Sequence, residues 1–108
     1  MRPSPRSPIA THLHPSLLPA FPGLHPQRQA LARGVKVSGC TVHFMDSGVD
    51  TGPIIAQSVV QIPEGCDEQT LTDLIRIEEH ELLPRAVRMF CEDRLRVEQG
   101  IVNIRKSV

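Results

Sequence analysis

Residues 39–57 read GCTVHFMDSGVDTGPIIAQ, and this stretch decides the fold. Its first part, residues 39–46, is a run of β-branched and aromatic residues of strand length, and the turn-like SGVDTGP follows it. A second, longer strand is predicted over residues 54–62, where a Pro-Glu-Gly turn ends it. The stretch therefore predicts two strands joined by a glycine-punctuated turn that carries two carboxylates.

One helix dominates the chain that follows. Asp67 is typical of an N-cap for a helix that begins at Glu68, and the acidic Glu68 suits the helix dipole in the first turn. Pro84 is expected to bend this helix or to set a new first turn. Short strands over residues 94–98 and 101–104 are expected after it. Apolar residues at helical spacing indicate one buried face: Leu71, Leu74, Ile75, Leu82, Ala86, Met89 and Phe90.

Proline shapes the chain before the central stretch, with seven of the ten prolines in the first 26 residues. Each proline fixes its own φ and biases the preceding residue away from helix, so residues 16–26 are expected to form a loop. Residues 9–13 predict one short strand before that loop. Pro26 suits the first position of a short helix that ends at Arg33, and Gly34 suits its left-handed stop.

Composition excludes several classes of protein. The 12 Lys and Arg residues balance 12 Asp and Glu residues, which argues against a general nucleic-acid binder, and the lack of Trp and Tyr argues against base stacking. No apolar run approaches the roughly 20 residues of a membrane helix, and residues 1–10 lack the apolar region of a secretory signal. Three widely spaced cysteines, Cys40, Cys66 and Cys91, fit reduced thiols. These features predict a small cytoplasmic domain with no nucleic-acid or membrane partner.

A first candidate site is THLHPSLLPAFPGLHP, residues 11–26, which holds three of the five histidines in a loop that proline stiffens. Imidazole, with an ordinary pKa of roughly 6.5, suits proton transfer near neutrality. His12 and His14 would share one face of an extended strand, a spacing that also suits a metal pair. Few further ligands are evident, because His43 and Asp46 are expected on separate elements and the sequence has no HxxxH or CxxC. An exposed loop histidine without any function is the plain alternative.

A second candidate site is the turn DSGVDTGP, residues 46–53. Two carboxylates in a glycine-punctuated turn are typical of a simple Asx-turn. In the functional interpretation, Asp50 lies beside a histidine and orients the imidazole or a water molecule, as the carboxylate of a catalytic triad does. Neither segment alone decides between these alternatives.

Together the segments carry a family resemblance. HPSLLPAFPGLHPQRQAL (residues 14–31), the stretch 39–57 and LTDLIRIEEHELLPRAV (residues 71–87) resemble the phosphoribosylglycinamide (GAR) formyltransferases of the formyltransferase superfamily. The resemblance implies an α/β protein: the carboxy-terminal half of a Rossmann-like fold, with a mixed sheet, one long helix and the amino-terminal half missing. It predicts a partial domain over residues 11–108, and the Pro-, Ser- and Arg-rich composition of residues 1–10 predicts a disordered segment before it.

The resemblance also implies an activity in de novo purine biosynthesis. The family transfers a formyl group from 10-formyltetrahydrofolate, its co-substrate, to the amine of glycinamide ribonucleotide, and it needs no metal. A truncated copy is expected to have weak or no activity alone. Two alternatives are a hydrolase similar to formyltetrahydrofolate deformylase, and a non-catalytic half-domain that assembles with a missing amino-terminal half or as a homodimer.

Site residues follow from the same resemblance. The family's catalytic trio is an Asn, a His two residues later and the Asp of the DxGP loop, which match His12, His14 and Asp50. His12 departs from the pattern, because an imidazole can donate to an oxyanion but differs from an amide in shape. Arg76 and Glu79 match positions that contact the ribonucleotide. Without the resemblance, these two are an ordinary solvated i,i+3 pair.

Overall fold

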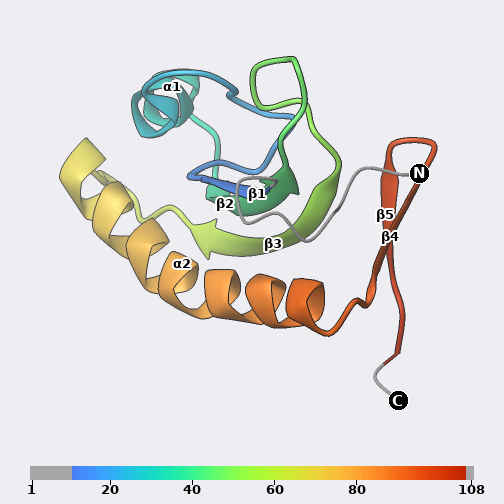
Figure 1. The fold of residues 1–108 in the computed structure, drawn as a ribbon. Helices are drawn as coiled ribbons and strands as arrows, with labels where there is room; N and C mark the ends of the chain where they lie inside the picture. The colour runs from blue at the N-terminus through green and yellow to red at the C-terminus, as the bar shows by residue number, and fades with distance from the viewer. Residues whose placement is uncertain (1–10, 107–108) are drawn as a thin grey trace.

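The computed structural model describes residues 11–106. The segment over residues 1–10 that is predicted to be disordered lies outside this range. Within it, no helix is both long and apolar enough to cross a lipid bilayer. The elements, in chain order, are β1 (Thr11–His14), α1 (Pro26–Arg33), β2 (Val37–Phe44), β3 (Ile54–Gln61), α2 (Glu68–Cys91), β4 (Leu95–Glu98) and β5 (Ile101–Ile104) (Figure 1).

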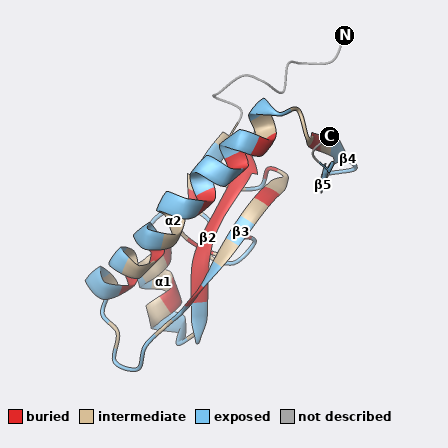
Figure 2. Ribbon diagram, turned by 90° about the horizontal axis from the view of Figure 1, so that it is seen from below, coloured by how far each residue is buried: buried red, intermediate tan, exposed pale blue. Residues whose placement is uncertain are grey.

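The three-stranded sheet has the order β1-β2-β3, and a separate hairpin pairs β4 with β5. The α/β class with one long helix is confirmed. Each pairing between the described strands is antiparallel, so the parallel strands of a mixed, Rossmann-like sheet are not among residues 11–106. The central strand β2 is buried almost from end to end (Figure 2). Its alternate side chains point to opposite faces, so the two faces of the sheet carry different chemistry.

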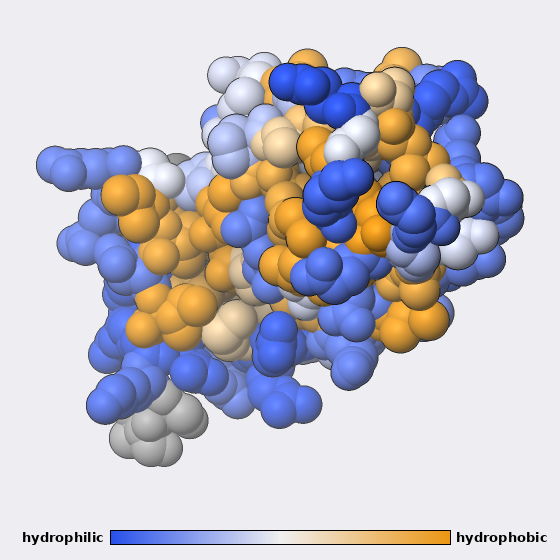
Figure 3. Space-filling model, turned by 180° about the vertical axis from the view of Figure 1, so that it is seen from behind, coloured by the Kyte–Doolittle hydropathy of each residue, from blue (hydrophilic) through white to orange (hydrophobic). Residues whose placement is uncertain are grey.

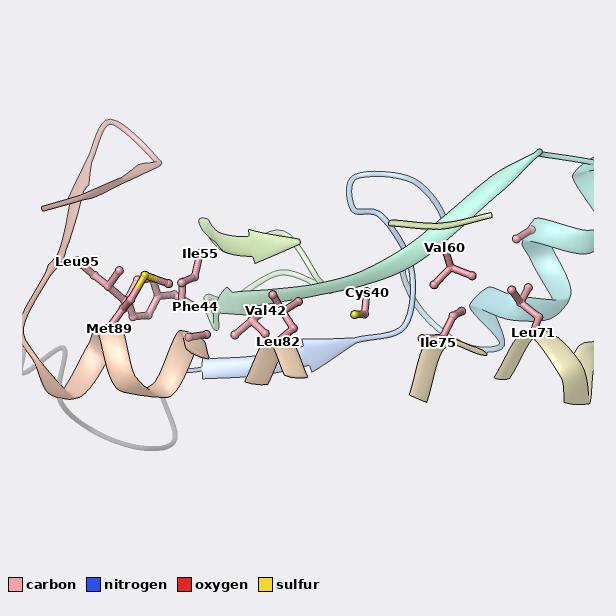
Figure 4. Packing of buried hydrophobic residues seen from close by; sticks show 12 residues of the cluster. Cys40, Val42, Phe44, Ile55, Val60, Leu71, Ile75, Leu82, Met89 and Leu95 are labelled. Atoms are coloured by element: carbon pink, nitrogen blue, oxygen red, sulfur yellow. The ribbon is translucent and has the colours of Figure 1, made fainter. Parts of the chain in front are cut away.

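One face of the sheet carries the apolar core, which α2 covers. Cys40, Val42 and Phe44 of β2 belong to one apolar cluster with the buried side chains of α2 (Figure 4). Figure 1 shows α2 curving along the sheet, and Figure 2 shows its buried positions on the side that faces the strands. The helix positions buried there are Leu71, Ile75, Leu82, Ala86 and Met89, which confirms five of the seven predicted positions as buried; Leu74 and Phe90 are partly buried against the cluster.

The start of α2 agrees with the sequence prediction, but no new helical turn begins at Pro84 in its middle. The Asp67 carboxylate accepts the backbone N–H of Thr70 at 2.8 Å, which confirms the N-cap, and that bond lowers the pKa of Asp67. A new first turn at Pro84 is wrong, because the helix continues unbroken to Cys91. Pro84 is exposed, so the turn that lacks its N–H faces away from the core, where water can satisfy the carbonyl left without a donor.

The remaining boundaries shift by one to a few residues. Helix α1 begins at Pro26 and ends at Arg33, and the φ of 76° at the following Gly34 confirms the left-handed stop. Strand β2 begins and ends two residues earlier than predicted, which leaves Asp46 in the turn. Strand β1 extends to His14 rather than ending at Leu13, so both histidines of the THLH segment belong to a strand.

Candidate functional site

Cross-strand register gathers the histidines on the face of the sheet opposite α2. His12 pairs with His43 and His14 pairs with Thr41 across β1 and β2. Alternation along both strands sends these four side chains to one face, while Leu13 and Val42 point toward the core. Two histidines that are two residues apart thus meet a third from the neighbouring strand.

Asp50, in the turn between β2 and β3, connects the three imidazoles. Its Oδ2 lies 3.4 Å from Nδ1 of His14 and accepts the backbone N–H of Gly23 at 2.8 Å. Its Oδ1 lies 3.6 Å from Nε2 of His43 and 3.7 Å from Nδ1 of His12. The carboxylate is 11% exposed, so water screens these contacts only weakly. The structure therefore brings His12, His14 and Asp50, the three predicted catalytic residues, into one cluster.

His14 and His12 occupy different environments within this cluster. His14 is only 4% exposed, and its Nε2–H donates to the Phe21 carbonyl at 3.0 Å. Its other ring nitrogen, Nδ1, faces the Asp50 carboxylate, so both nitrogens of the ring lie next to acceptor oxygens. His12 has a side chain that is 49% exposed and lines a pocket of about 150 Å³ together with His43 and Asp50. His12 is thus the member of the predicted trio whose ring meets solvent.

Hydrogen bonds to the sheet hold the proline-rich loop between β1 and α1 over this face. The Thr41 hydroxyl donates to the Ser16 carbonyl at 2.7 Å and accepts the Leu18 N–H at 3.1 Å. The Gln57 side-chain amide donates to the Leu18 carbonyl at 2.9 Å and to the Thr41 hydroxyl at 3.0 Å. These bonds fix the loop that supplies the Phe21 carbonyl, and hence one partner of His14.

The two carboxylates of the β2–β3 turn have separate tasks. Asp46 Oδ1 accepts the Thr51 hydroxyl at 2.7 Å and the Gly48 N–H at 2.9 Å, which is the Asx-turn that the sequence suggested. These bonds, the hydroxyl first, lower the pKa of Asp46. Asp50 adopts a left-handed backbone with φ 55°, a conformation that Asp tolerates better than most residues. The turn thus directs Asp50 toward the histidines while Asp46 stabilises the turn itself.

A substitution at Gly52 is expected to displace Asp50. A Cβ at this position would overlap the Phe44 carbonyl oxygen, so the backbone has to move. Overpacking of this kind costs about 1–3 kcal/mol, and here the shift falls on the turn that carries Asp50. We expect Gly52→Ala to change the NMR signals of the His12, His14 and His43 rings. Gly65→Ala is the control for backbone strain outside the site, because its φ of 72° disfavours alanine although open space surrounds it; equal ring shifts in both variants would contradict the prediction.

Arg76 and Glu79 lie apart from this cluster, on α2, which covers the opposite face of the sheet. Burial raises the pKa of Glu79, and the charge of Arg76 opposes that shift. Burial also raises the pKa of the Cys40 thiol to about 11, with the charge of Glu79 adding to it. Glu79 therefore lies near the core side of β2, and the structure does not bring the pair together with His14 and Asp50.

The sequence interpretation left His43, Thr41 and Gln57 without a role in the site. His43 lies at 3.6 Å from Asp50, and the other two hold the loop. Alternation within the TVHF segment indicates that residues 41 and 43 share a face, and that signal is visible in the sequence. Their register against β1 is not visible there, because a loop and a helix separate the two strands.

Comparisons with known proteins agree on one family. The family model described as formyl transferase matches residues 7–87. Phosphoribosylglycinamide formyltransferase of Mycobacterium tuberculosis is 57% identical over 74 residues, which cover 68% of this chain and 34% of that protein. The structure of glycinamide ribonucleotide transformylase 1 from Symbiobacterium toebii matches with a TM-score of 0.88 and 54% identity, over 89% of this chain and 45% of that one.

A hydrolase is also among the similar structures. The formyltetrahydrofolate deformylase from Pseudomonas syringae matches with a TM-score of 0.84 and 34% identity, over 89% of this chain and 32% of that chain. The chain therefore spans less than half the length of each of these three proteins.

Proposed function

Because the chain belongs to the formyl transferase family, we propose that it provides part of the active site of a GAR formyltransferase. The reaction is transfer of the formyl group of 10-formyltetrahydrofolate to the amine of glycinamide ribonucleotide, in de novo purine biosynthesis in the cytoplasm. The observation that carries the proposal is the buried contact of 3.4 Å between His14 and Asp50, with His12 exposed at the adjoining pocket. Arg76 and Glu79 are proposed to contact the ribonucleotide from α2.

Each member of the cluster has a chemical task in this reaction. The amine attacks the formyl carbon, and the carbonyl oxygen becomes an oxyanion. The exposed ring of His12 donates a hydrogen bond to that oxygen, and the imidazole of His14, paired with Asp50, adds electrostatic stabilisation when it carries a proton on each nitrogen. Asp50 orients a water molecule that takes the proton from the amine and delivers it to the departing folate nitrogen.

The proposed active site needs a second polypeptide segment to complete it. A pocket of about 150 Å³ is smaller than the roughly 300–1,000 Å³ of a typical ligand site. Figure 3 shows apolar side chains gathered on one face of the molecule, and those exposed across the chain include Leu24, Met45, Val49, Val59 and Ile77. A face on which apolar side chains gather is typical of an interface. We therefore propose weak or no activity for this chain alone, and assembly with an amino-terminal half or as a homodimer.

A hydrolytic function is the second candidate, supported by the likeness to the Pseudomonas syringae deformylase. The same cluster would then activate water as the formyl acceptor in place of an amine. The HPS and TGP motifs, residues 14–16 and 51–53, favour transfer to the amine over this reaction.

The test is an assay of the full chain with 10-formyltetrahydrofolate, with and without glycinamide ribonucleotide. It is run alone and after mixing with the amino-terminal segment of the Symbiobacterium toebii relative. We expect tetrahydrofolate release that requires the amine and rises on mixing. Formate release without the amine would establish the hydrolase instead. A third outcome is a complex that elutes as one species by size exclusion but consumes no 10-formyltetrahydrofolate, either with or without glycinamide ribonucleotide. That result would contradict both enzymatic functions and support a non-catalytic half-domain.

A further inference from the structure

We propose that His12, His43 and Asp50 form a binding site for a divalent transition-metal ion, with Zn²⁺ as the expected occupant. The site goes beyond the proposed formyl transfer and does not depend on it. The cluster joins one ligand atom from β1, one from β2 and one from the turn after β2, and these three atoms lie within 4.8 Å of one another. Two imidazoles and a carboxylate are the ligand set that suits zinc among the common biological cations.

The spacing of the three ligand atoms matches a zinc coordination sphere. Nδ1 of His12 lies 3.4 Å from Nε2 of His43 and 3.7 Å from Oδ1 of Asp50, and the last two atoms are 3.6 Å apart. A point equidistant from atoms with these separations lies about 2.1 Å from each, which is the length of Zn–N and Zn–O bonds in proteins. Small side-chain movements therefore suffice to bring an ion into contact with all three ligands.

The same distances are long for direct hydrogen bonds. Nitrogen donors bond to oxygen acceptors most often at about 2.9–3.0 Å, whereas every contact within this trio is 3.4 Å or more. The hydrogen bonds that these residues make to the backbone are shorter: Gly23 donates to Asp50 at 2.8 Å, and His43 donates to the Phe44 carbonyl at 2.8 Å. The trio is thus spaced as ligands around a common centre rather than as closely bonded partners.

Contacts outside the trio orient two of its members. The Nδ1–H of His43 donates to the Phe44 carbonyl at 2.8 Å, which leaves the lone pair of Nε2 directed toward the cluster. Asp50 is fixed through Oδ2 by Gly23 and His14, which leaves Oδ1 for an ion. A backbone carbonyl or a charged partner on the far atom of each ligand is the usual support of a protein zinc site.

Burial gives the site a closed side and an open side. His43 is 3% exposed and Asp50 is 11% exposed, whereas the His12 side chain is 49% exposed at the mouth of the pocket. The pocket wall includes Asp46 and Val49, and its open volume of about 150 Å³ accommodates water molecules. Three protein ligands with a fourth position open to solvent is the arrangement of reactive rather than purely structural zinc sites. The fourth ligand would be water or a small anion.

His12 is the residue on which the site depends. The resemblance placed an Asn at this position and implied no metal, and an amide is a far weaker zinc ligand than imidazole. With His12 present, the third ligand joins the buried pair His43 and Asp50 from the solvent side. The metal site is thus a property of this chain's own sequence.

The test is calorimetric titration of the full, reduced chain with zinc chloride. The chain carries Cys66→Ser and Cys91→Ser, because these accessible thiols would bind zinc themselves. We expect one ion per chain, at least tenfold weaker binding for His12→Ala, and unchanged binding for His80→Ala, an exposed histidine on α2. Titration with Co²⁺ should give the visible absorption bands of four-coordinate cobalt, and these should disappear in His12→Ala.

Three results would overturn the site. They are the lack of stoichiometric binding, equal affinity in His12→Ala and the parent chain, and equal losses in His12→Ala and His80→Ala. His12 is half-exposed, so its replacement should leave the circular dichroism spectrum unchanged. Asp50→Asn is a second test of zinc binding that retains the fold, because it keeps an oxygen at Oδ1 but removes the charge that should hold the ion; zinc binding equal to that of the parent chain would also overturn the site. No folate or ribonucleotide enters these measurements, so a failed zinc titration leaves the proposed formyl transfer untouched, and the reverse also holds.

Discussion

Replacing Asp50 by Asn is expected to lower the rate of formyl transfer by the assembled protein by about 10³-fold or more. The amide keeps the shape of the carboxylate but loses its charge, so it can neither offer His14 a charged partner nor assist the water molecule that takes the proton from the attacking amine. The fold should survive. Asn tolerates the left-handed backbone of φ 55°, and its amide oxygen can still accept the Gly23 N–H.

The control for this substitution is Asp46→Asn in the same turn. Asp46 faces Gly48 and Thr51 rather than the histidines, and an Asn oxygen can accept the same two bonds. We expect transfer within a few-fold of the parent rate. The measurement is the initial rate of tetrahydrofolate release by the mixture with the complementing segment, with equal folate binding checked by fluorescence. If Asp50→Asn retained the parent rate, the role assigned to the carboxylate would be wrong.

Replacing Leu82 by Ala is expected to lower the free energy of unfolding by about 2–5 kcal/mol. Leu82 is 0% exposed at the middle of α2, where it lies opposite Val42 of β2 in the core cluster (Figure 4). Removing its branched end leaves a cavity in the interface that joins the helix to the sheet. The measurement is urea unfolding followed by circular dichroism, with the midpoint expected to fall.

The neighbouring leucine is the matched control. Leu83 is 37% exposed on the same helix, so Leu83→Ala removes the same atoms from a position that packs far less. We expect a change of less than about 1 kcal/mol. Equal losses in the two variants would mean that α2 does not cover the sheet with the face the structure assigns to it.

Local signals in the sequence predict much of the fold. Apolar residues at helical spacing identify the buried face of α2, and Asp67 identifies its start, because both depend on residues a few positions apart. The effect of Pro84 on the helix is predicted less well from the sequence. A proline disfavours a helix locally, but the buried residues on both sides of it, Leu82 and Ala86, hold the two halves on one sheet.

The candidate site is less accessible to sequence analysis, because it is assembled from distant segments. His14 and Asp50 are predicted to be neighbours only through the family motifs, and the structure places them 3.4 Å apart. His43 enters the cluster through the β1–β2 register, which long-range pairing fixes and no local pattern reports. Thr41 and Gln57 act on the loop from strands that follow it in the chain, so their contacts follow only from the folded structure.

The β4–β5 hairpin has a thermodynamic consequence for the end of the chain. Its two strands have only each other as partners among the described strands, and they are tied to the core beside α2 by the buried Leu95 and the partly buried Val102. An isolated two-stranded ribbon is barely stable in water. Its amide protons should therefore exchange with solvent through a local opening that leaves the sheet and α2 closed, long before those of β2 exchange.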